Sequence, residues 1–252
     1  QDLTTKIFNS NVKIIADSAN GLSEGSGFIV SKDGYVITNL HVINKYVSEN
    51  INNGFDANHR VGVDGVNVYC LFEQGTRYEN SISKFILFKM NVVAYDKKGD
   101  LALLKFKNNF YTQSAYGIED GFTQTCILKT SKLPSYGDYV MAIGNALGYG
   151  VSVSTGIVSL PNSKLYRYKF GYDMIQTDCV INSGNSGGAL FDRFGNVVGV
   201  NTLGIIVDSL ENVSMAIPSS AVQIFLDKVN KGLNTTSVVI LQKPNFINYS
   251  IV

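Results

Sequence analysis

The sequence is organised around one stretch, Gln176-Thr177-Asp178-Cys179-Val180-Ile181-Asn182-Ser183-Gly184-Asn185-Ser186-Gly187-Gly188-Ala189-Leu190. Its central residues, from Gly184 to Gly188, place one hydroxyl among small residues. A serine nucleophile needs its Oγ on a sharp turn, with backbone N–H groups directed at the carbonyl oxygen that gains charge. Glycines permit such a turn and let a substrate backbone approach closely. Ser186 is therefore a candidate nucleophile, and the alternative is a glycine-rich hairpin turn.

A serine nucleophile also needs a base, and the chain contains 2 histidines. His41 lies towards the end of a β-branched apolar run that begins at Tyr35, whereas His59 lies in a polar stretch rich in Asn. A rigidly held imidazole suits general-base catalysis, and an exposed loop histidine does not. We predict that His41 is the base. Without Ser186, it would be interpreted as a hydrogen-bonded core histidine.

The orienting carboxylate is assigned to Asp100, which directly precedes the apolar segment Leu101-Ala102-Leu103-Leu104. An acid in this position is drawn partly into the interior. The alternative is a turn aspartate after Lys97-Lys98-Gly99. The chain order His41, Asp100, Ser186 matches the chymotrypsin triad and differs from the orders in subtilisin and the α/β-hydrolases.

Composition excludes several other classes of function. The chain has 252 residues, enough for one large domain or two small ones with a substantial core. A net charge of +1, without a basic block, argues against binding to nucleic acid or an anionic membrane. No apolar run reaches the roughly 18 residues that a membrane-spanning helix needs. Abundant Gly, Tyr and Phe with only 4 Pro are typical of an antiparallel β protein.

Three cysteines, Cys70, Cys126 and Cys179, cannot form a complete set of disulfides. The chain has no Cys-x-x-Cys motif, and two distant histidines do not make a zinc site, so we predict no metal and no organic cofactor. Cys179 lies in an apolar run shortly before Ser186. We interpret it as a small core residue rather than a second nucleophile.

Several motifs, in order, resemble the protease domain of the HtrA (DegP-like) serine proteases within the chymotrypsin-like superfamily. They are Gly25-Ser26-Gly27-Phe28-Ile29-Val30, Thr38-Asn39-Leu40-His41-Val42, Asp100-Leu101-Ala102-Leu103-Leu104-Lys105 and the stretch from Gln176 to Gly188. The resemblance implies an all-β fold of two six-stranded antiparallel β-barrels with a short C-terminal helix. It implies one protease domain over residues 1–252, with barrels at about 7–110 and 123–218 and a helix and tail at 219–252.

Local patterns place the individual elements. Strands are expected at residues 12–16, 26–30, 35–40, 61–72, 82–95, 139–144, 151–160 (a strand pair), 197–202, 213–217 and 237–241. A turn is expected at 20–23 and a helix at 219–231, capped by Ser219-Ser220. The long interval between His41 and Asp100 predicts an insertion within residues 44–91, either a lid or contact surface or a tolerated loop.

Residues 162–172 interleave basic and aromatic side chains, and we expect a short exposed hairpin rather than a platform for stacking nucleic acid. In HtrA proteases this region holds a mobile activation loop. The tail after Leu233 is too short for the PDZ domain that these proteases usually append, so none is expected in this chain.

The resemblance implies a serine endopeptidase that cleaves unfolded or extended proteins through an acyl-enzyme. Ser186 would attack, His41 would carry the proton and Asp100 would fix the imidazole. The N–H groups of Gly184 and Ser186 would form the oxyanion hole, with Asn185 holding the turn between them.

The primary pocket follows from the same resemblance. In chymotrypsin-like folds its floor is the residue six positions before the nucleophile, here Val180. Its walls would be Ile181 and the segment Thr202-Leu203-Gly204. An apolar floor lacks the acid that binds Lys or Arg, so we expect a P1 preference for small or medium aliphatic residues.

Two other functions remain open: a catalytically silent binding module with a protease fold, and another nucleophilic hydrolase such as an esterase. The resemblance further implies protein or peptide substrates. It implies export to the periplasm or cell surface, as for bacterial relatives, and assembly into a homotrimer.

Overall fold

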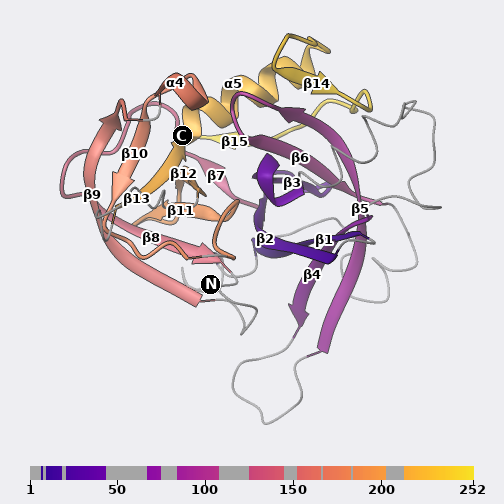
Figure 1. Cartoon of the computed structure of the whole chain (residues 1–252), viewed down its shortest axis with the longest axis horizontal. Helices are drawn as coiled ribbons and strands as arrows, with labels where there is room; N and C mark the ends of the chain where they lie inside the picture. The colour runs from indigo at the N-terminus through magenta and orange to yellow at the C-terminus, as the bar shows by residue number, and fades with distance from the viewer. Residues whose placement is uncertain are drawn as a thin grey trace.

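The computed structural model describes residues 7, 10–18, 21–43, 67–74, 84–107, 125–144, 152–165, 167–182, 184–202 and 213–252. These residues form two β-sheets that lie side by side, with helix α5 (Ser219–Asn230) at their junction (Figure 1). None of the helices in these ranges has the length and apolar character that crossing a bilayer requires.

Six strands of the first sheet close into an antiparallel barrel. Their order is β5-β4-β1-β2-β3-β6, and pairing between β5 and β6 completes the ring. The strands are β1 (Asn11–Ser18), β2 (Gly21–Ile29), β3 (Tyr35–Asn39), β4 (Asn67–Gln74), β5 (Lys84–Asp96) and β6 (Leu101–Phe106). Strand β14 (Val238–Ile240) is added to β5 as the seventh member of this sheet.

The second sheet also closes, in the order β11-β8-β9-β10-β13-β12, through pairing between β11 and β12. Its antiparallel strands are β8 (Tyr139–Gly144), β9 (Ser152–Ser163), β10 (Met174–Thr177), β11 (Ala189–Asp192), β12 (Val197–Thr202) and β13 (Ser214–Pro218). Two short strands extend this sheet in parallel: β7 (Ile127–Leu128) pairs with β12, and β15 (Ser250–Ile251) pairs with β7. The predicted fold of two six-stranded antiparallel barrels with a short C-terminal helix is confirmed.

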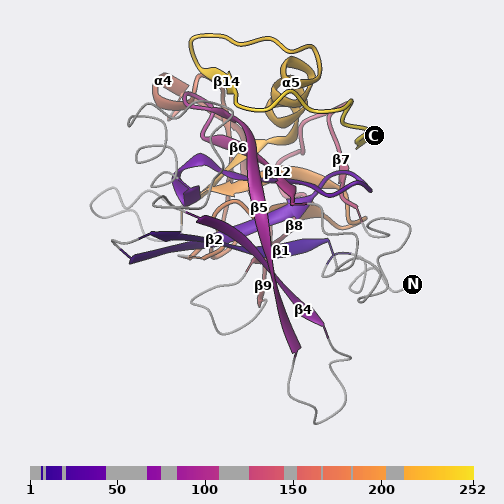
Figure 2. The same ribbon diagram turned by 90° about the vertical axis from the view of Figure 1, so that its right-hand side faces the viewer.

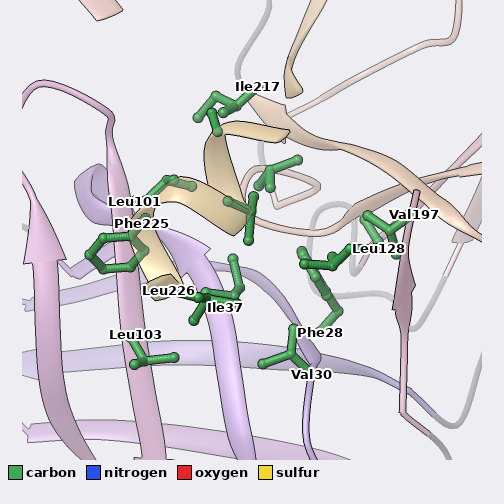
Figure 3. Packing of buried hydrophobic residues seen from close by; sticks show 14 of the residues in the cluster. Phe28, Val30, Ile37, Leu101, Leu103, Leu128, Val197, Ile217, Phe225 and Leu226 are labelled. Atoms are coloured by element: carbon green, nitrogen blue, oxygen red, sulfur yellow. The ribbon is translucent and has the colours of Figure 1, made fainter. Parts of the chain in front are cut away.

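The largest cluster of buried side chains joins the two barrels. It contains Ile37 and Leu101 of the first barrel, Val197 of the second, and Phe225 and Leu226 of α5. Figure 3 shows the two α5 side chains beside those of the first barrel. The helix therefore fills the junction between the barrels with apolar volume.

Replacing Phe225 by Ala is expected to lower the free energy of unfolding by about 3–5 kcal/mol, because the change leaves a cavity at this junction. Phe225 is 1% exposed, whereas its neighbour Ile224 is 56% exposed. Ile224→Ala is therefore the matched control, expected to change stability by less than about 0.5 kcal/mol. Chemical denaturation followed by circular dichroism measures both variants. Equal losses of stability would contradict the packing role of Phe225.

Strands β4 and β5 extend beyond the first barrel as a two-stranded arm (Figures 1 and 2). The pairing of β4 with β1 ends at Leu71, whereas β4 and β5 continue to pair as far as Gln74 and Lys84. This arm lies within the interval in which an insertion is predicted. The remainder of that interval, residues 44–66 and 75–83, lies outside the described residues.

Two predictions of turns and strands are wrong. The turn expected at residues 20–23 is not present over Gly21 to Ser23, because these residues begin β2 and Leu22 pairs with Asp17 of β1. The strand pair expected at residues 151–160 is one long strand, β9, which pairs with β8 along one edge and with β10 along the other.

Two predictions near the helices need correction. Ser163 of β9 pairs with Met174 of β10, as a hairpin at residues 162–172 requires, but the connection contains a short helix, α4 (Arg167–Phe170), and Phe170 is buried in the main core rather than exposed. The N-cap of α5 is Pro218 and makes no side-chain capping bond. The Ser219 hydroxyl instead donates to the carbonyl of Lys129, so this side chain binds the second sheet rather than the helix N-terminus.

The residues after α5 cross both barrels. Val238–Ile240 pair antiparallel with β5, so the strand predicted at 237–241 belongs to the first sheet. Ser250–Ile251 pair with β7 of the second sheet. Between these contacts, the amide of Asn230 donates to the carbonyl of Ile247 (3.1 Å) and accepts from its N–H (2.8 Å). We call residues 231–252 the strap.

Candidate active site

His41 lies in a 3₁₀ helix, η1 (Leu40–Ile43), that directly follows β3. Its neighbours Leu40, Val42 and Ile43 are buried, whereas the imidazole is partly exposed. The apolar neighbours thus anchor the turn in the core of the first barrel while His41 faces outward. The rigid placement that we predicted is achieved by this helical turn rather than by the end of the strand itself.

Asp100 lies in the turn between β5 and β6. Its φ of 51° is in the left-handed region, which is unfavourable for a residue other than glycine. Two hydrogen bonds to its carbonyl, from Leu40 N (3.1 Å) and Asn39 Nδ2 (3.0 Å), help to hold this conformation. The side chain is 13% exposed. Asp100 is therefore both a turn residue and a largely buried carboxylate.

His41 and Asp100 are joined by two hydrogen bonds. The backbone N–H of His41 donates to Oδ1 of Asp100 (2.9 Å), and the imidazole Nδ1 lies 2.8 Å from Oδ2. An ionised carboxylate only accepts hydrogen bonds, so Nδ1 carries the proton that lies between the two side chains. In the neutral imidazole, Nε2 is then left as a proton acceptor.

The turn that carries Ser186 is attached to the first barrel. Ser26 N donates to the carbonyl of Ser186 (2.8 Å), and Ser26 Oγ donates to the carbonyl of Gly184 (2.5 Å). Gly187 has a φ of 84°, and a Cβ on it would collide with Thr38 of β3. The glycine is therefore required for close approach, and the nucleophile turn lies against the strand that leads to His41.

The two reactive atoms proposed from the sequence, Ser186 Oγ and His41 Nε2, are both buried. Within the part of the chain that the structure describes, neither has a hydrogen-bond partner. A hydroxyl donor and an imidazole acceptor are complementary, and catalytic hydrogen bonds are often long before substrate binds. A bond between these atoms would satisfy both groups at once.

The backbone around Ser186 presents two N–H groups. Gly184 has a φ of 101°, and Asn185 N donates to the carbonyl of Asn182 (3.0 Å), which closes the turn. Among the described residues, the N–H groups of Gly184 and Ser186 donate to no protein acceptor. Two backbone N–H groups that lie two residues apart in such a turn can together stabilise a carbonyl oxygen that gains negative charge.

The structure describes three of the five residues predicted to form the primary pocket, and these three differ in exposure and in their contacts. Val180 is 53% exposed, and its N–H donates to Ser154 Oγ (2.8 Å). Ile181 is buried and packs in the core of the second barrel. Thr202 is buried, and its Oγ1 accepts a hydrogen bond from Asn39 (3.3 Å). The other two wall residues, Leu203 and Gly204, lie outside the described residues.

The interpretation of Cys179 as a small core residue is confirmed. Cys179 is buried in the core of the second barrel, and burial raises the pKa of its thiol. A thiol that stays protonated is a poor nucleophile. Cys126 is also buried, and its thiol donates a hydrogen bond to Ser10 Oγ (3.2 Å).

The role of Asn39 was not predicted from the sequence. The Asn39 amide donates hydrogen bonds to the carbonyl of Asp100 in the first barrel and to Oγ1 of Thr202 in the second. It therefore links the two barrels next to the His41–Asp100 pair. A detectable signal was present, because Asn39 is a polar residue at the end of a strand whose other residues are mostly apolar. Buried side-chain amides are normally hydrogen-bonded.

A family model for a trypsin-like peptidase domain matches residues 25–200. The chain belongs to this family. The trypsin-like domain is 32% identical over 207 residues to serine protease HTRA1 of Xenopus laevis, an alignment that covers 81% of this chain and 36% of the relative. It is 34% identical over 212 residues to a probable periplasmic serine endoprotease, DegP-like, of Bartonella henselae, covering 83% and 34%. Protease Do-like 5, chloroplastic, of Arabidopsis thaliana is 33% identical over 202 residues, covering 77% and 52%.

Solved structures of proteases also superpose on this trypsin-like domain. Deg5 superposes with a TM-score of 0.65 at 28% identity, covering 88% of this chain and 89% of that one. A serine endoprotease from Yersinia pestis superposes with a TM-score of 0.64 at 27% identity, covering 90% and 64%. The resemblance to HtrA proteases is confirmed. The chain spans about a third to a half of the length of the curated relatives named above.

Proposed function

We propose that the chain is a serine endopeptidase that works through an acyl-enzyme. The observation that carries the proposal is the pair of hydrogen bonds from His41 to the Asp100 carboxylate, beside the turn of Ser186. His41 Nε2 would accept the proton as Ser186 Oγ attacks the peptide carbonyl, and would return it to the leaving amine. The Asp100 carboxylate would hold the imidazole in the required tautomer.

The tetrahedral intermediate would be stabilised by the N–H groups of Gly184 and Ser186. Neither donates to a protein acceptor among the described residues, so both are available to a substrate oxygen. Loss of one such donor typically costs about 3–4 kcal/mol of transition-state stabilisation.

Unfolded or extended protein segments are the proposed substrates, because an extended backbone can approach the glycine-rich turn and the relatives are named as proteases. The exposed Val180 is proposed as the floor of the primary pocket. An aliphatic floor favours small or medium aliphatic P1 residues through burial of apolar surface.

Replacing Val180 by Asp is expected to shift the P1 preference towards Lys and Arg by about tenfold or more in relative kcat/KM, because charge-assisted hydrogen bonds contribute about 1.5–3 kcal/mol. Cleavage of a peptide library by the wild type and the variant measures the shift. Val153→Asp, which changes another exposed valine, is the matched control. An unchanged P1 profile would place the pocket elsewhere.

Three measurements on the wild-type chain test the endopeptidase proposal: hydrolysis of denatured casein, labelling by a fluorophosphonate probe and hydrolysis of a simple ester. An endopeptidase is expected to hydrolyse the casein and to be labelled by the probe. A silent binding module would give neither, a possibility motivated by the missing bond between Ser186 Oγ and His41 Nε2 among the described residues. An esterase would take the probe and cleave simple esters but leave casein intact.

We further propose export and self-association for this chain. Export is supported by the relative named as periplasmic, whereas other relatives are named as chloroplastic or come from a frog. Cell fractionation of the source organism tests it. A homotrimer is proposed from the resemblance to HtrA proteases, and light scattering of the purified chain tests that assembly.

A further inference from the structure

The turn that carries Asp100 is held from several directions. Asp96 Oδ1 accepts hydrogen bonds from the N–H groups of Lys98 (3.1 Å) and Gly99 (2.9 Å). The hydroxyl of Tyr172 donates to the carbonyl of Gly99 (2.6 Å). This carbonyl belongs to the peptide unit whose nitrogen is that of Asp100. Tyr172 therefore bonds to the backbone unit that directly precedes the carboxylate-bearing residue.

Tyr172 reaches this turn from the other barrel. It lies between α4 and β10, and its ring is partly buried against the main core cluster. Burial, followed by the nearby carboxylates of Asp96 and Asp100, raises the pKa of its phenol above the usual range. The hydroxyl therefore stays protonated and acts as a donor to the Gly99 carbonyl.

The turn at Gly99 and the segment around Tyr172 pack closely against each other. A Cβ on Gly99 would collide with the Tyr172 hydroxyl and with the Asp96 carboxylate. Gly171, next to Tyr172, has a φ of 82° and lies against the side chain of Lys98. A small movement of residues 167–172 would therefore be transmitted to the backbone at Gly99.

We propose that Tyr172 is a positioning residue: its hydroxyl fixes the peptide unit between Gly99 and Asp100, and so directs the Asp100 carboxylate towards His41. The proposal rests on the proposed function. Its physical basis is the positive φ of Asp100, a conformation that persists only where the surroundings specify it. Without the hydroxyl, the Gly99 carbonyl loses its partner and the peptide unit can rotate, which turns the carboxylate away from Nδ1.

Tyr172→Phe removes only the hydroxyl and tests this role. We expect kcat for a peptide substrate to fall about tenfold, with KM unchanged within about twofold, because the Gly99 carbonyl loses the hydrogen bond that keeps the Asp100 carboxylate directed towards His41. Tyr249→Phe is the matched control: its hydroxyl also makes a 2.6 Å hydrogen bond, to Asp227 in α5, outside the site. This control should keep wild-type kcat, and thermal unfolding should show similar losses of stability for both variants.

A second readout does not depend on hydrolysis. The proton between His41 Nδ1 and Asp100 should give a low-field ¹H NMR resonance, assigned by its persistence in His59→Gln. We expect Tyr172→Phe to shift or broaden it, Gly99→Ala to do the same by displacing the hydroxyl, and Tyr249→Phe to leave it unchanged. An unchanged resonance and unchanged kcat in Tyr172→Phe would overturn the proposal, as would an equal fall of kcat in Tyr249→Phe. If the wild type cleaves nothing, the proposed function fails, and the resonance alone decides whether Tyr172 positions Asp100.

Discussion

Ser186→Ala is expected to reduce kcat for peptide hydrolysis by at least about 10⁴-fold and to abolish labelling by a fluorophosphonate. The methyl group cannot attack a carbonyl or form an acyl-enzyme, so only binding and the N–H groups of the turn remain to assist water. The backbone of the turn should be unchanged, because Ser186 holds it through its carbonyl, which accepts from Ser26, and not through its hydroxyl. KM for a peptide should therefore change little.

The matched control for this loss is Ser159→Ala, which removes an exposed hydroxyl from β9. It should keep wild-type kcat. Circular dichroism and thermal unfolding establish that both variants remain folded. Residual casein hydrolysis near the wild-type rate in Ser186→Ala, after mass spectrometry excludes contamination, would remove Ser186 from the reaction and with it the acyl-enzyme.

Asp100→Asn is expected to reduce kcat by about 10⁴-fold, for a reason that the geometry specifies. Both carboxylate oxygens accept hydrogen bonds, one from the backbone N–H of His41 and the other from its imidazole Nδ1. An amide has only one acceptor oxygen. The backbone N–H cannot change its role, so it takes that oxygen and leaves the NH₂ group facing Nδ1.

A donor facing Nδ1 stabilises the wrong tautomer of His41. Nδ1 becomes the acceptor, the proton moves to Nε2, and Nε2 can no longer take a proton from Ser186. Binding should survive, so the loss should appear in kcat rather than in KM. Asp138→Asn is the control, since its carboxylate accepts from Ser135 N in a separate turn. Wild-type kcat in Asp100→Asn would show that the imidazole needs no such orientation.

The parts of the site that could be predicted are those with a local cause. The turn around Ser186 requires glycines, as the collision that a side chain on Gly187 would cause shows. His41 follows a strand whose apolar pattern is readable, and Asp100 opens another. Each of the three residues could thus be chosen from its own local sequence, and the chain order His41, Asp100, Ser186 indicated that they act together.

The parts that could not be predicted depend on contacts between distant segments. Residues 167–170 are basic and aromatic, and their composition does not reveal that Phe170 is buried in the core and that they form a helical turn within the connection between β9 and β10. Ser219 has the composition of an N-cap, but the carbonyl of Lys129 takes its hydroxyl. Tyr172 and Gly99 are far apart in sequence, so no pattern along the chain relates them. Tertiary contacts overrode local preference at each of these positions.

The strap affects the order in which the protein folds during its synthesis. Lys97 N, in the turn that leads to Asp100, donates to the carbonyl of Ser237, and β14 pairs with the end of β5. A ribosome makes the first barrel long before it makes residues 237–240, so the β5 edge stays unpaired while the second barrel is translated. Contacts between such distant segments form late and slowly. The nascent chain therefore carries an incompletely supported Asp100 turn until the strap has emerged and docked.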